Sequence, residues 1–440
     1  MKRNRTFTTQ TPKEKAFLVG VEIFNQPGLL SVSDSLKELS LLADTAGLEV
    51  VGQAYQKLDH PHPATLIGAG KVEEIKILST ESNAQLVIFD DELSPRHLRE
   101  LEQNLGKSLR VLDRTSLILD IFAQHAKTSE GKLQVELAQY EYLYPRLTRA
   151  WTHLARQAGG GAGRTGNIGG VGLRGPGETQ LEVDRRRIRT RISFLKDELE
   201  KVRGHRKQYR NMRKKTHLPI ITLVGYTNAG KSTLLNRLTG SNVEVADKLF
   251  ATLDPTTRRL SIGNGNQVLV TDTVGFIQKL PTQLVASFRA TLEEISEADL
   301  LLHVVDFSHP AALAQWKSVQ KTLEEIECGE IPVLTVLNKT DHLPDSIIKS
   351  QIHPDWGNAI CISALTGDGI DLLIKTIEKE LFENFISIQV RLPYKQGNLI
   401  SLFHRSGRID KIEQGVTEVS IKGALPGRLI ADFLPFSQKK

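Results

Sequence analysis

Short apolar runs and amphipathic stretches alternate along residues 17–125. The apolar runs are rich in Val, Ile, Leu and Phe and are typical of strands: 17–23, 48–55, 85–90 and 109–113. Between them, helical periodicity covers 33–45, 72–79 and 95–104. Strands alternating with helices predict a small, mostly parallel α/β sheet. A Gly-Ala-Gly-Lys fragment at 68–71 could hold a phosphate, but we interpret it as an ordinary helix-entry turn.

Residues 128–215 carry two apolar seams with steps of three, four or seven residues. The first seam comprises Leu133, Leu137, Tyr140, Tyr144, Leu147, Trp151 and Leu154, and the second comprises Leu181, Ile188, Ile192, Leu195, Leu199 and Val202. A repeat of about 3.5 residues is typical of packed helices. We therefore predict an antiparallel helical hairpin, with two unrelated surface helices as the alternative. Pro145 should kink the first helix, because proline lacks an amide N–H.

The loop between the seams has an unusual composition. Residues 159–177 contain ten glycines in 19 positions, which disfavours both helix and strand. Residues 141–215 hold 19 Lys and Arg against 7 Asp and Glu, a net of +12, whereas the remainder holds 38 against 44, a net of −6. A flexible linker would not need this charge, so we favour a tip that binds RNA phosphates. The candidate RNA contacts are Arg164, Arg174, Arg185, Arg186, Arg187, Arg189 and Arg191.

The bulk properties favour a cytoplasmic protein of several domains. The 440 residues are 40% hydrophobic and 25% charged, and no apolar run approaches the ~20 residues of a membrane span. The amino-terminal stretch is polar and basic and does not resemble a secretory signal. Cys328 and Cys361 have no metal-binding spacing, which is typical of reduced thiols. We expect a monomer that neither binds DNA nor inserts stably into a membrane.

The patterns together predict four domains. These are an N-terminal α/β domain at 1–126, the hairpin at 127–215, a doubly wound nucleotide-binding domain at 216–382, and a small α+β domain at 383–440. The last domain has strand-like runs at 385–392, 407–413 and 417–422 and a helical stretch near 399–404. It carries no recognisable chemical motif.

A strand at 220–224, a glycine-containing loop and a helix at 233–238 surround the sequence Gly225-Tyr-Thr-Asn-Ala-Gly-Lys-Ser232. This is GxxxxGK[ST] in the strand–loop–helix context that a P-loop requires. Backbone amides of such a loop cradle phosphates, Lys231 would reach the β and γ phosphates, and Ser232 would bind Mg²⁺.

A second motif, Asp272-Thr-Val-Gly275, ends a strand at 267–271. Asp272 would hold Mg²⁺ through water, and the Gly275 N–H would contact the γ phosphate. Between the two motifs, a switch loop must supply a threonine to the same ion. Thr252, Thr256 and Thr257 all compete for that role.

The sequence Asn338-Lys-Thr-Asp341 ends a strand at 333–337 and identifies the base as guanine. The Asp341 carboxylate can accept hydrogen bonds from guanine N1–H and its exocyclic amine, a donor pair that adenine lacks. Ser363-Ala-Leu365, after a strand at 359–362, fits a further base-contacting loop.

The motifs together define a candidate nucleotide site. Its members are Gly225, Tyr226, Thr227, Asn228, Ala229, Gly230, Lys231, Ser232, Thr233, Phe250, Ala251, Thr252, Leu253, Asp254, Asp272, Thr273, Val274, Gly275, Asn338, Lys339, Thr340, Asp341, Ser363, Ala364 and Leu365.

The residue after the second motif is Phe276, where signalling GTPases place a glutamine that orients the attacking water. Phenylalanine cannot do this, so we expect slow intrinsic hydrolysis that a partner or an ion accelerates. The Asn228 side chain could help to coordinate K⁺ beside the phosphates. Alternatively, it only stabilises the loop. The expected catalytic group therefore comprises Lys231, Gly275, Asn228 and one of the three threonines.

The run Gly-Pro-Gly-Glu-Thr-Gln-Leu-Glu-Val-Asp-Arg-Arg at 175–186 and Phe-Ala-Thr-Leu-Asp-Pro-Thr-Thr-Arg at 250–258 resemble the HflX family of ribosome-associated GTPases. The resemblance covers nearly the whole chain, although the final domain matches only loosely. It implies an N-terminal α/β domain, a helical hairpin, a GTPase domain and a C-terminal domain. It also implies that Thr252 is the switch ligand of Mg²⁺.

The resemblance further implies binding to the large ribosomal subunit, with the glycine-rich loop directed at the peptidyl transferase region, and ribosome splitting under stress. An ATP-binding role suggested for the family's first domain finds only weak support in residues 1–125. We carry two alternatives. One is a signalling GTPase with a protein or membrane partner, and the other is an RNA-binding protein whose nucleotide site only regulates. The localised positive charge disfavours the first, and the complete motif set disfavours the second.

Overall fold

The computed structural model describes residues 13–437, apart from 25–29, 107, 148–179, 217, 242–248, 251, 253, 264–265, 280–294, 327, 330, 345–352, 384, 416 and 427–428. The chain divides into two compact units. The first comprises Met1–Lys201 with Lys279–Phe288, and the second comprises Val202–Gln278 with Arg289–Lys440. Among the described residues, no helix is long and apolar enough to cross a bilayer. The four predicted domain boundaries remain a prediction.

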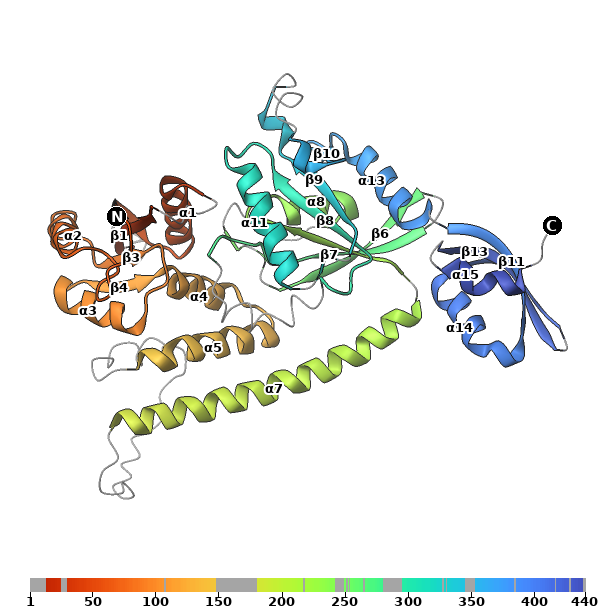
Figure 1. The fold of residues 1–440 in the computed structure, drawn as a ribbon, viewed down its shortest axis with the longest axis horizontal. Coiled ribbons are helices and arrows are strands. Elements are labelled where there is room, and N and C mark those ends of the chain that lie inside the picture. Colours follow the sequence, from red (N-terminus) through yellow and green to blue (C-terminus); the bar gives the residue numbers. More distant parts are fainter. Residues whose placement is uncertain are drawn as a thin grey trace, which may run out of the picture. The chain divides into compact units, whose positions relative to one another are not determined.

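The N-terminal sheet of the first unit is parallel, with strand order β2-β1-β3-β4 (Figure 1). Its strands are β1 (Lys15–Ile23), β2 (Glu49–Leu58), β3 (Leu86–Phe89) and β4 (Arg110–Asp113). The helices are α1 (Val32–Thr45), α2 (Ala69–Glu81), α3 (Pro95–Leu105) and α4 (Arg114–His125). This confirms the predicted α/β class. The pattern did not identify α4, whose sequence is too apolar to show an amphipathic stripe.

Side-chain caps fix where these helices begin. Ser31 and Ser94 accept hydrogen bonds from backbone amides of the first turns of α1 and α3, and Asp113 does the same for α4. Each cap satisfies an amide that has no partner within the helix. Helix α2 begins after Gly68 without a side-chain cap, and Lys71 pairs with Glu74 of the same helix. The fragment at 68–71 is therefore an ordinary helix entry in this structure.

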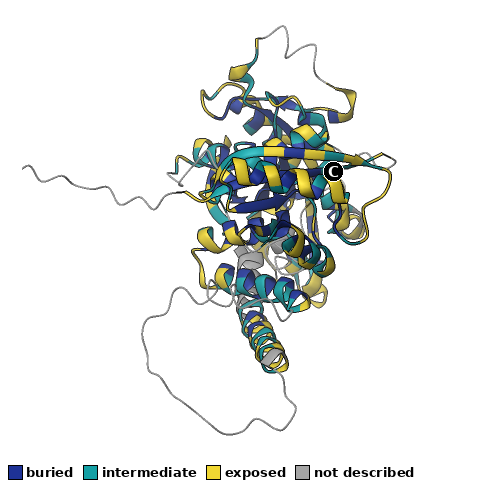
Figure 2. Cartoon of the chain, turned by 90° about the vertical axis from the view of Figure 1, so that its left-hand side faces the viewer, coloured by how far each residue is buried: buried dark blue, intermediate teal, exposed yellow. Residues whose placement is uncertain are grey.

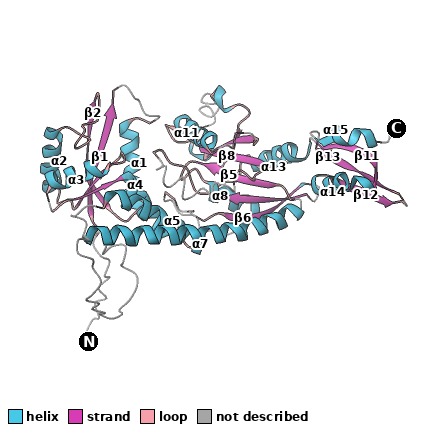
Figure 3. Ribbon diagram, turned by 60° about the horizontal axis from the view of Figure 1, so that its bottom comes forward, coloured by secondary structure: helices cyan, strands magenta, loops and turns pink. Residues whose placement is uncertain are grey.

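The hairpin helices are α5 (Ser129–Leu143) and α7 (Gln180–Thr216), which lie side by side (Figures 1 and 3). Leu137 of α5 packs against Leu195 and Leu199 of α7. The Arg185 guanidinium donates to the Leu147 carbonyl, near the end where α7 begins, so the helices run antiparallel as predicted.

The first hairpin helix ends earlier than the apolar seam predicted. Helix α5 stops at Leu143, and a 3₁₀ turn over Tyr144–Arg146 follows. Pro145 lies in this turn, and Leu147 after it is extended, so the α-helical hydrogen bonding is interrupted at the proline. The seam positions Trp151 and Leu154, and the whole loop 159–177, lie outside the described residues.

The second unit contains a six-stranded sheet of order β10-β9-β8-β5-β7-β6, in which only β6 runs antiparallel. Its strands are β5 (Ile220–Gly225), β6 (Thr256–Ile262), β7 (Asn266–Asp272), β8 (Leu300–Asp306), β9 (Val333–Asn338) and β10 (Ile360–Cys361). The α-helices α8 (Lys231–Thr239), α11 (Ala312–Glu325) and α13 (Ile370–Glu378) accompany it, with 3₁₀ turns at Thr340–His342 and Pro354–Trp356. The sequence analysis predicted neither the strands β6 and β8 nor the helices α11 and α13.

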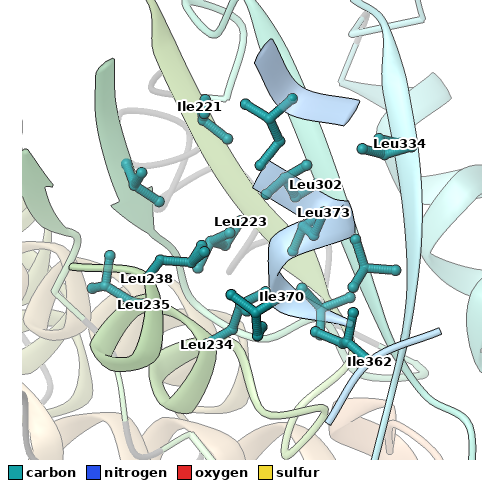
Figure 4. Close-up of a cluster of buried hydrophobic side chains, with 14 of the residues drawn as sticks. Ile221, Leu223, Leu234, Leu235, Leu238, Leu302, Leu334, Ile362, Ile370 and Leu373 are labelled. Atoms are coloured by element: carbon teal, nitrogen blue, oxygen red, sulfur yellow. The ribbon is translucent and has the colours of Figure 1, made fainter. Parts of the chain in front are cut away.

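The hydrophobic core of this sheet supports the loop between β5 and α8. Leu234 and Leu235 of α8 pack with Leu223 of β5, Leu302 of β8 and Leu373 of α13 (Figure 4). All five side chains are fully buried. Each such leucine contributes roughly 1.5–3 kcal/mol through removal from water. The loop between β5 and α8 is therefore held at both ends by packed elements.

A π-helical turn at Lys379–Glu383 leads into the small C-terminal module of strands β11 (Phe385–Pro393), β13 (Glu418–Pro426) and β12 (Arg408–Gln414), which pair antiparallel in that order. It also contains α14 (Gly397–Ser406), α15 (Ile430–Phe433) and 3₁₀ turns at Tyr394–Gln396 and Leu434–Phe436. Phe403 and Phe433 pack edge to face, 5.4 Å apart, in its core. The predicted α+β module is thus correct. Figure 2 shows how buried and exposed residues are distributed over the chain.

Candidate functional site

The P-loop lies between β5 and α8, and two of its glycines are required by close packing. At Gly225 an added Cβ would lie 2.2 Å from the Val304 carbonyl oxygen, and at Gly230 it would lie 2.3 Å from the Asn338 side-chain nitrogen. Gly230 also has φ +92° and directly precedes the first helical residue. Only glycine tolerates both conditions, so the backbone turns into α8 with its amides directed towards the loop.

Lys231 is buried at the start of α8, and its Nζ donates to the carbonyls of Gly225 (3.1 Å) and Tyr226 (2.8 Å). Burial lowers the pKa of Lys231 to about 8, although the nearby Asp272 carboxylate opposes this shift. A phosphate beside the ammonium would add negative charge and restore the protonated form. The Lys231 ammonium can therefore bind an anion such as a phosphate.

Three oxygen-bearing side chains converge next to Lys231. The Ser232 hydroxyl donates to Asp272 Oδ2 (2.6 Å), and the Thr252 hydroxyl lies 2.9 Å from Ser232 Oγ. Asp272 is fully buried, and its Oδ1 has no hydrogen-bond partner within the described part of the chain. Burial raises the pKa of Asp272, and the Lys231 charge and the Ser232 hydroxyl counteract that effect.

A hard cation fits this constellation. Hydroxyl and carboxylate oxygens are the ligands that Mg²⁺ prefers, usually together with water and substrate phosphates. The unpartnered Asp272 oxygen is a site for a metal-bound water, and a bound cation would also stabilise the buried carboxylate. Ser232, Thr252 and Asp272 would thus hold Mg²⁺ with the nucleotide.

The structure distinguishes the three threonines that the sequence left open. Thr256 and Thr257 lie on β6, and the Thr257 hydroxyl is 3.0 Å from that of Thr271 on β7. Thr252 precedes the strand and lies beside Ser232. Phe250 is buried with φ +59°, whereas Ala251 and Leu253 lie outside the described residues and Asp254 is partly buried.

The loop after β7 is hydrogen-bonded to the P-loop. The Phe276 N–H donates to the Gly225 carbonyl (3.0 Å), and the Thr227 N–H donates to the Phe276 carbonyl (2.8 Å). An added Cβ on Gly275 would lie 2.7 Å from Thr227 Cα and 3.0 Å from Lys231 Nζ. Glycine is therefore required where the chain passes the phosphate-binding lysine. The Thr273 hydroxyl fixes the start of this loop to β5 by donating to the Leu223 carbonyl (2.7 Å). Val274, the next residue, is half-buried.

The side chain of Asn338 joins the base-side loops. Its Nδ2 donates to the Ala229 carbonyl, and its Oδ1 accepts from the Ala364 N–H, both at 2.9 Å. Lys339 has φ +64° and pairs with Asp306 (2.7 Å), while Thr340 donates to the Ile362 carbonyl (2.9 Å). The Asp341 side chain, 18% exposed, lies in the 3₁₀ turn that follows, with Oδ2 3.6 Å from His342 Nε2.

One residue that the sequence did not single out shapes this end of the site. Arg237 on α8 donates from Nε to the Ala364 carbonyl (3.1 Å) and also bonds the Leu365 carbonyl. These contacts span more than 120 residues, so no local pattern signals them. They fix the loop containing Ser363, which is fully buried, while the Leu365 side chain remains exposed.

The predicted RNA contacts fall into two groups. Arg164 and Arg174 lie outside the described residues. On α7, Arg185, Arg186, Arg187 and Arg189 are exposed, and Arg191 is half-buried with a bidentate bond to Glu136 (2.8 and 2.9 Å). Arg185 and Arg189 also bond Leu147 and Tyr144 across the hairpin, but among the described candidates Arg191 alone is half-buried, so its guanidinium is the least available to RNA.

The phosphate loop, the oxygen cluster and the guanine-specific loops define the chain as a P-loop GTPase. Four family models match the chain: "GTP-binding GTPase N-terminal" at 33–123, "GTP-binding GTPase Middle Region" at 125–213, "50S ribosome-binding GTPase" at 220–339 and "HflX C-terminal domain" at 350–423.

Two relatives compared by sequence agree with these models. The chain is 44% identical over 411 residues to GTPase HflX of Caldanaerobacter subterraneus subsp. tengcongensis, covering 93% of this chain and 90% of the relative. It is 45% identical over 381 residues to GTPase HflX of Escherichia coli, covering 86% of each. A GTP-binding protein of Sulfolobus solfataricus in complex with GDP is 25% identical, with a TM-score of 0.42, 83% of this chain and 98% of that chain covered. The chain belongs to the HflX family and is a GTP-hydrolysing enzyme.

Proposed function

We propose that this GTPase binds the large ribosomal subunit in its GTP state and splits or rescues ribosomes under stress. The strongest support is the match of residues 220–339 to a family of GTPases described as 50S ribosome-binding. The net charge of +12 on residues 141–215 adds a segment suited to ribosomal RNA. We place the protein in the cytoplasm, partly on ribosomes and as a monomer, without DNA binding or membrane insertion.

The nucleotide would control binding through the loops around Thr252 and Gly275. Thr252 lies at the oxygen cluster and Gly275 beside Lys231, so both loops can report whether Mg²⁺ and a γ phosphate are present. The GTP-ordered state would carry the hairpin into ribosomal RNA through Arg164, Arg174 and the exposed arginines of α7. Contact would accelerate hydrolysis, which is slow alone because Phe276 cannot orient water, and GDP would then favour release.

Two alternatives make different predictions. A signalling GTPase with a protein or membrane partner needs no basic hairpin, and a passive RNA-binding protein would bind RNA regardless of nucleotide. The localised charge disfavours the former. The buried lysine and the oxygen cluster built around Asp272 disfavour the latter, because a purely regulatory site needs no hydrolytic arrangement.

We expect purified large ribosomal subunits to raise GTP turnover at least about tenfold, because Phe276 cannot orient the attacking water and a partner can supply a group that does. A variant lacking residues 159–177 should keep its turnover without ribosomes and lose most of the stimulation. Turnover would be measured under multiple-turnover conditions at two salt concentrations, since Lys and Arg contacts weaken steeply with salt.

A full-length variant with Arg164→Gln and Arg174→Gln is the matched control for the deletion. It separates loss of charge from loss of the loop itself. Absence of stimulation in the intact protein would contradict the ribosomal role and leave the GTPase activity standing. Undiminished stimulation of the deletion variant would contradict the role of the loop.

We also propose that Asn228 helps to hold a K⁺ ion beside the phosphates. Asn228 is exposed in the P-loop with φ +59°, a conformation that glycine also adopts without strain. GTP turnover should then be several-fold faster in K⁺ than in Na⁺, because the ion supplies positive charge in the transition state. Asn228→Gly should abolish the difference while preserving the loop, and equal turnover of the intact protein in both ions would contradict K⁺ binding.

A further inference from the structure

Arg237 lies in the last turn of α8, and its guanidinium contacts the loop between β10 and α13. Nε donates to the Ala364 carbonyl (3.1 Å), and Nη2 donates to the Leu365 carbonyl. The Gly367 backbone passes the same group with φ +102°, and an added Cβ there would lie 3.5 Å from Arg237 Cζ. One guanidinium therefore holds two successive carbonyls, an arrangement that suits the planar fork of arginine.

The helix that carries Arg237 is fixed by packing. Leu234, Leu235 and Leu238 of α8 are buried in the core of the sheet (Figure 4). Lys231 begins the same helix, so α8 connects the phosphate end of the site to the loop on the base side. The helix and the loop both belong to the second compact unit. Arg237 is thus a fixed point from which this loop can be positioned.

Both backbone polar groups of Ala364 are bonded. Its N–H donates to Asn338 Oδ1 (2.9 Å), and its carbonyl accepts from Arg237. In a trans peptide the carbonyl and the following N–H point in opposite directions. The Leu365 N–H is therefore directed away from Arg237. Among the described residues, no group accepts a hydrogen bond from this N–H.

A hydrogen-bond donor in this loop suits guanine. Guanine carries a carbonyl at C6, next to the N1–H that Asp341 would bind, whereas adenine carries an amine at C6. The Leu365 N–H would bond the guanine carbonyl and would face a second donor in adenine. Asn338 belongs to the guanine motif and bonds the preceding amide, so the Leu365 N–H lies beside the base-contacting loops.

We propose that Arg237 is a positioning residue for guanine recognition. By holding the Ala364 and Leu365 carbonyls, it directs the Leu365 N–H at the C6 carbonyl of the base. Arg237 acts through the loop and does not touch the nucleotide. Because GDP and GTP share the base, the effect is the same for both and is separate from hydrolysis. The proposal concerns the GTPase site alone and does not depend on ribosome binding.

The test is equilibrium binding of GDP and ADP, with Mg²⁺, to the full-length Arg237→Met variant, whose unbranched side chain has no donor. The affinity for GDP should fall about five- to thirtyfold, since the bond to the base loses its fixed geometry. The affinity for ADP, which cannot use that bond, should change by less than about twofold. In GTP hydrolysis KM should rise while kcat stays within about twofold, because other loops hold the phosphates.

Inosine diphosphate distinguishes the role of Arg237 from that of Asp341. Its base keeps the C6 carbonyl and N1–H of guanine but lacks the exocyclic amine. Arg237→Met should therefore weaken binding of inosine diphosphate and GDP by the same factor. If the variant instead disturbed Asp341, inosine diphosphate would be weakened less than GDP, and the proposal would be overturned.

Arg237→Lys should show a smaller loss of the same pattern, because an ammonium can still donate to one of the two carbonyls. Lys317→Met is the matched control, since Lys317 forms an exposed pair with Asp355 (3.1 Å) on the same domain and should change no affinity. Equal weakening of ADP and GDP, or a fall in kcat, would show general loosening of the domain and contradict the proposal, as would an unchanged affinity for GDP. The value of kcat at saturating GTP also reports that each variant is folded.

Discussion

Asp341→Asn is expected to weaken binding of GDP by about two to three orders of magnitude and to create binding of xanthosine diphosphate. The carboxylate is acceptor-only, which suits the two donors of guanine, N1–H and the exocyclic amine. An asparagine amide would direct a donor at that amine, leaving buried groups unmatched. Xanthine carries a carbonyl in place of the amine and can accept from the new amide. Equilibrium titration with the two diphosphates measures the exchange.

Asp355→Asn is the control for this substitution, because Asp355 forms an exposed pair with Lys317 (3.1 Å) elsewhere on the same domain. It should leave both affinities unchanged. The intact protein should also discriminate against ADP by a similar factor, since adenine lacks the donor pair. If Asp341→Asn bound GDP normally, other groups would have to recognise the base, and the assignment of Asp341 to the guanine would be wrong.

The chemistry of the nucleotide site was readable from the sequence because each motif is local. A P-loop, DxxG and NKxD each occupy a few consecutive residues after an apolar strand, so residue type and spacing specify them together. The structure accordingly brings Lys231, Ser232 and Asp272 into one cluster. The elements predicted for this domain also agree closely with the observed β5, β7, β9, β10 and α8, although β6, β8, α11 and α13 were not predicted.

Contacts between distant segments were not readable. Residue chemistry alone could not separate Thr252 from Thr256 and Thr257, and only the family resemblance favoured Thr252. The geometric difference among the three depends on β6 pairing with β7, and the exposed arginines of β6 hid its alternation of apolar and polar residues. The bond from Arg237 to the Ala364 carbonyl joins residues 127 positions apart. Such partners depend on how whole elements pack, and one sequence contains no periodic signal of that packing.

The hairpin illustrates an intermediate case. The period of about 3.5 residues correctly predicted two antiparallel helices, because a packed seam leaves its repeat in the sequence. It could not locate the end of the first helix at Leu143, since apolar residues continue the same spacing beyond Pro145. Proline removes a hydrogen bond whether it kinks or ends a helix, and the surrounding contacts decide between the two.

Asp272→Asn is expected to lower GTP turnover by about two to four orders of magnitude, because two charge interactions are lost at once. Asparagine still accepts from the Ser232 hydroxyl, but it is neutral and directs an amide N–H towards the place of the unpartnered Oδ1. Mg²⁺ would lose the negative charge that the Asp272 carboxylate supplies through a metal-bound water. In the intact protein, the Asp272 carboxylate opposes the lowering of the Lys231 pKa by burial. In the variant this pKa would therefore fall below about 8.

Turnover measured against Mg²⁺ concentration distinguishes these effects. The variant should need more Mg²⁺ for half-maximal turnover. Its kcat/KM, which reports the free enzyme before a phosphate restores the Lys231 charge, should begin to fall at a lower pH than that of the intact protein as pH rises, because Lys231 of the free variant deprotonates earlier. Asp299→Asn is the matched control, since Asp299 accepts from the Ile220 N–H (2.8 Å) at the opposite end of the same sheet and should change neither property. An unchanged Mg²⁺ requirement in Asp272→Asn would place the ion elsewhere, because no other carboxylate among the described residues is bonded to Ser232.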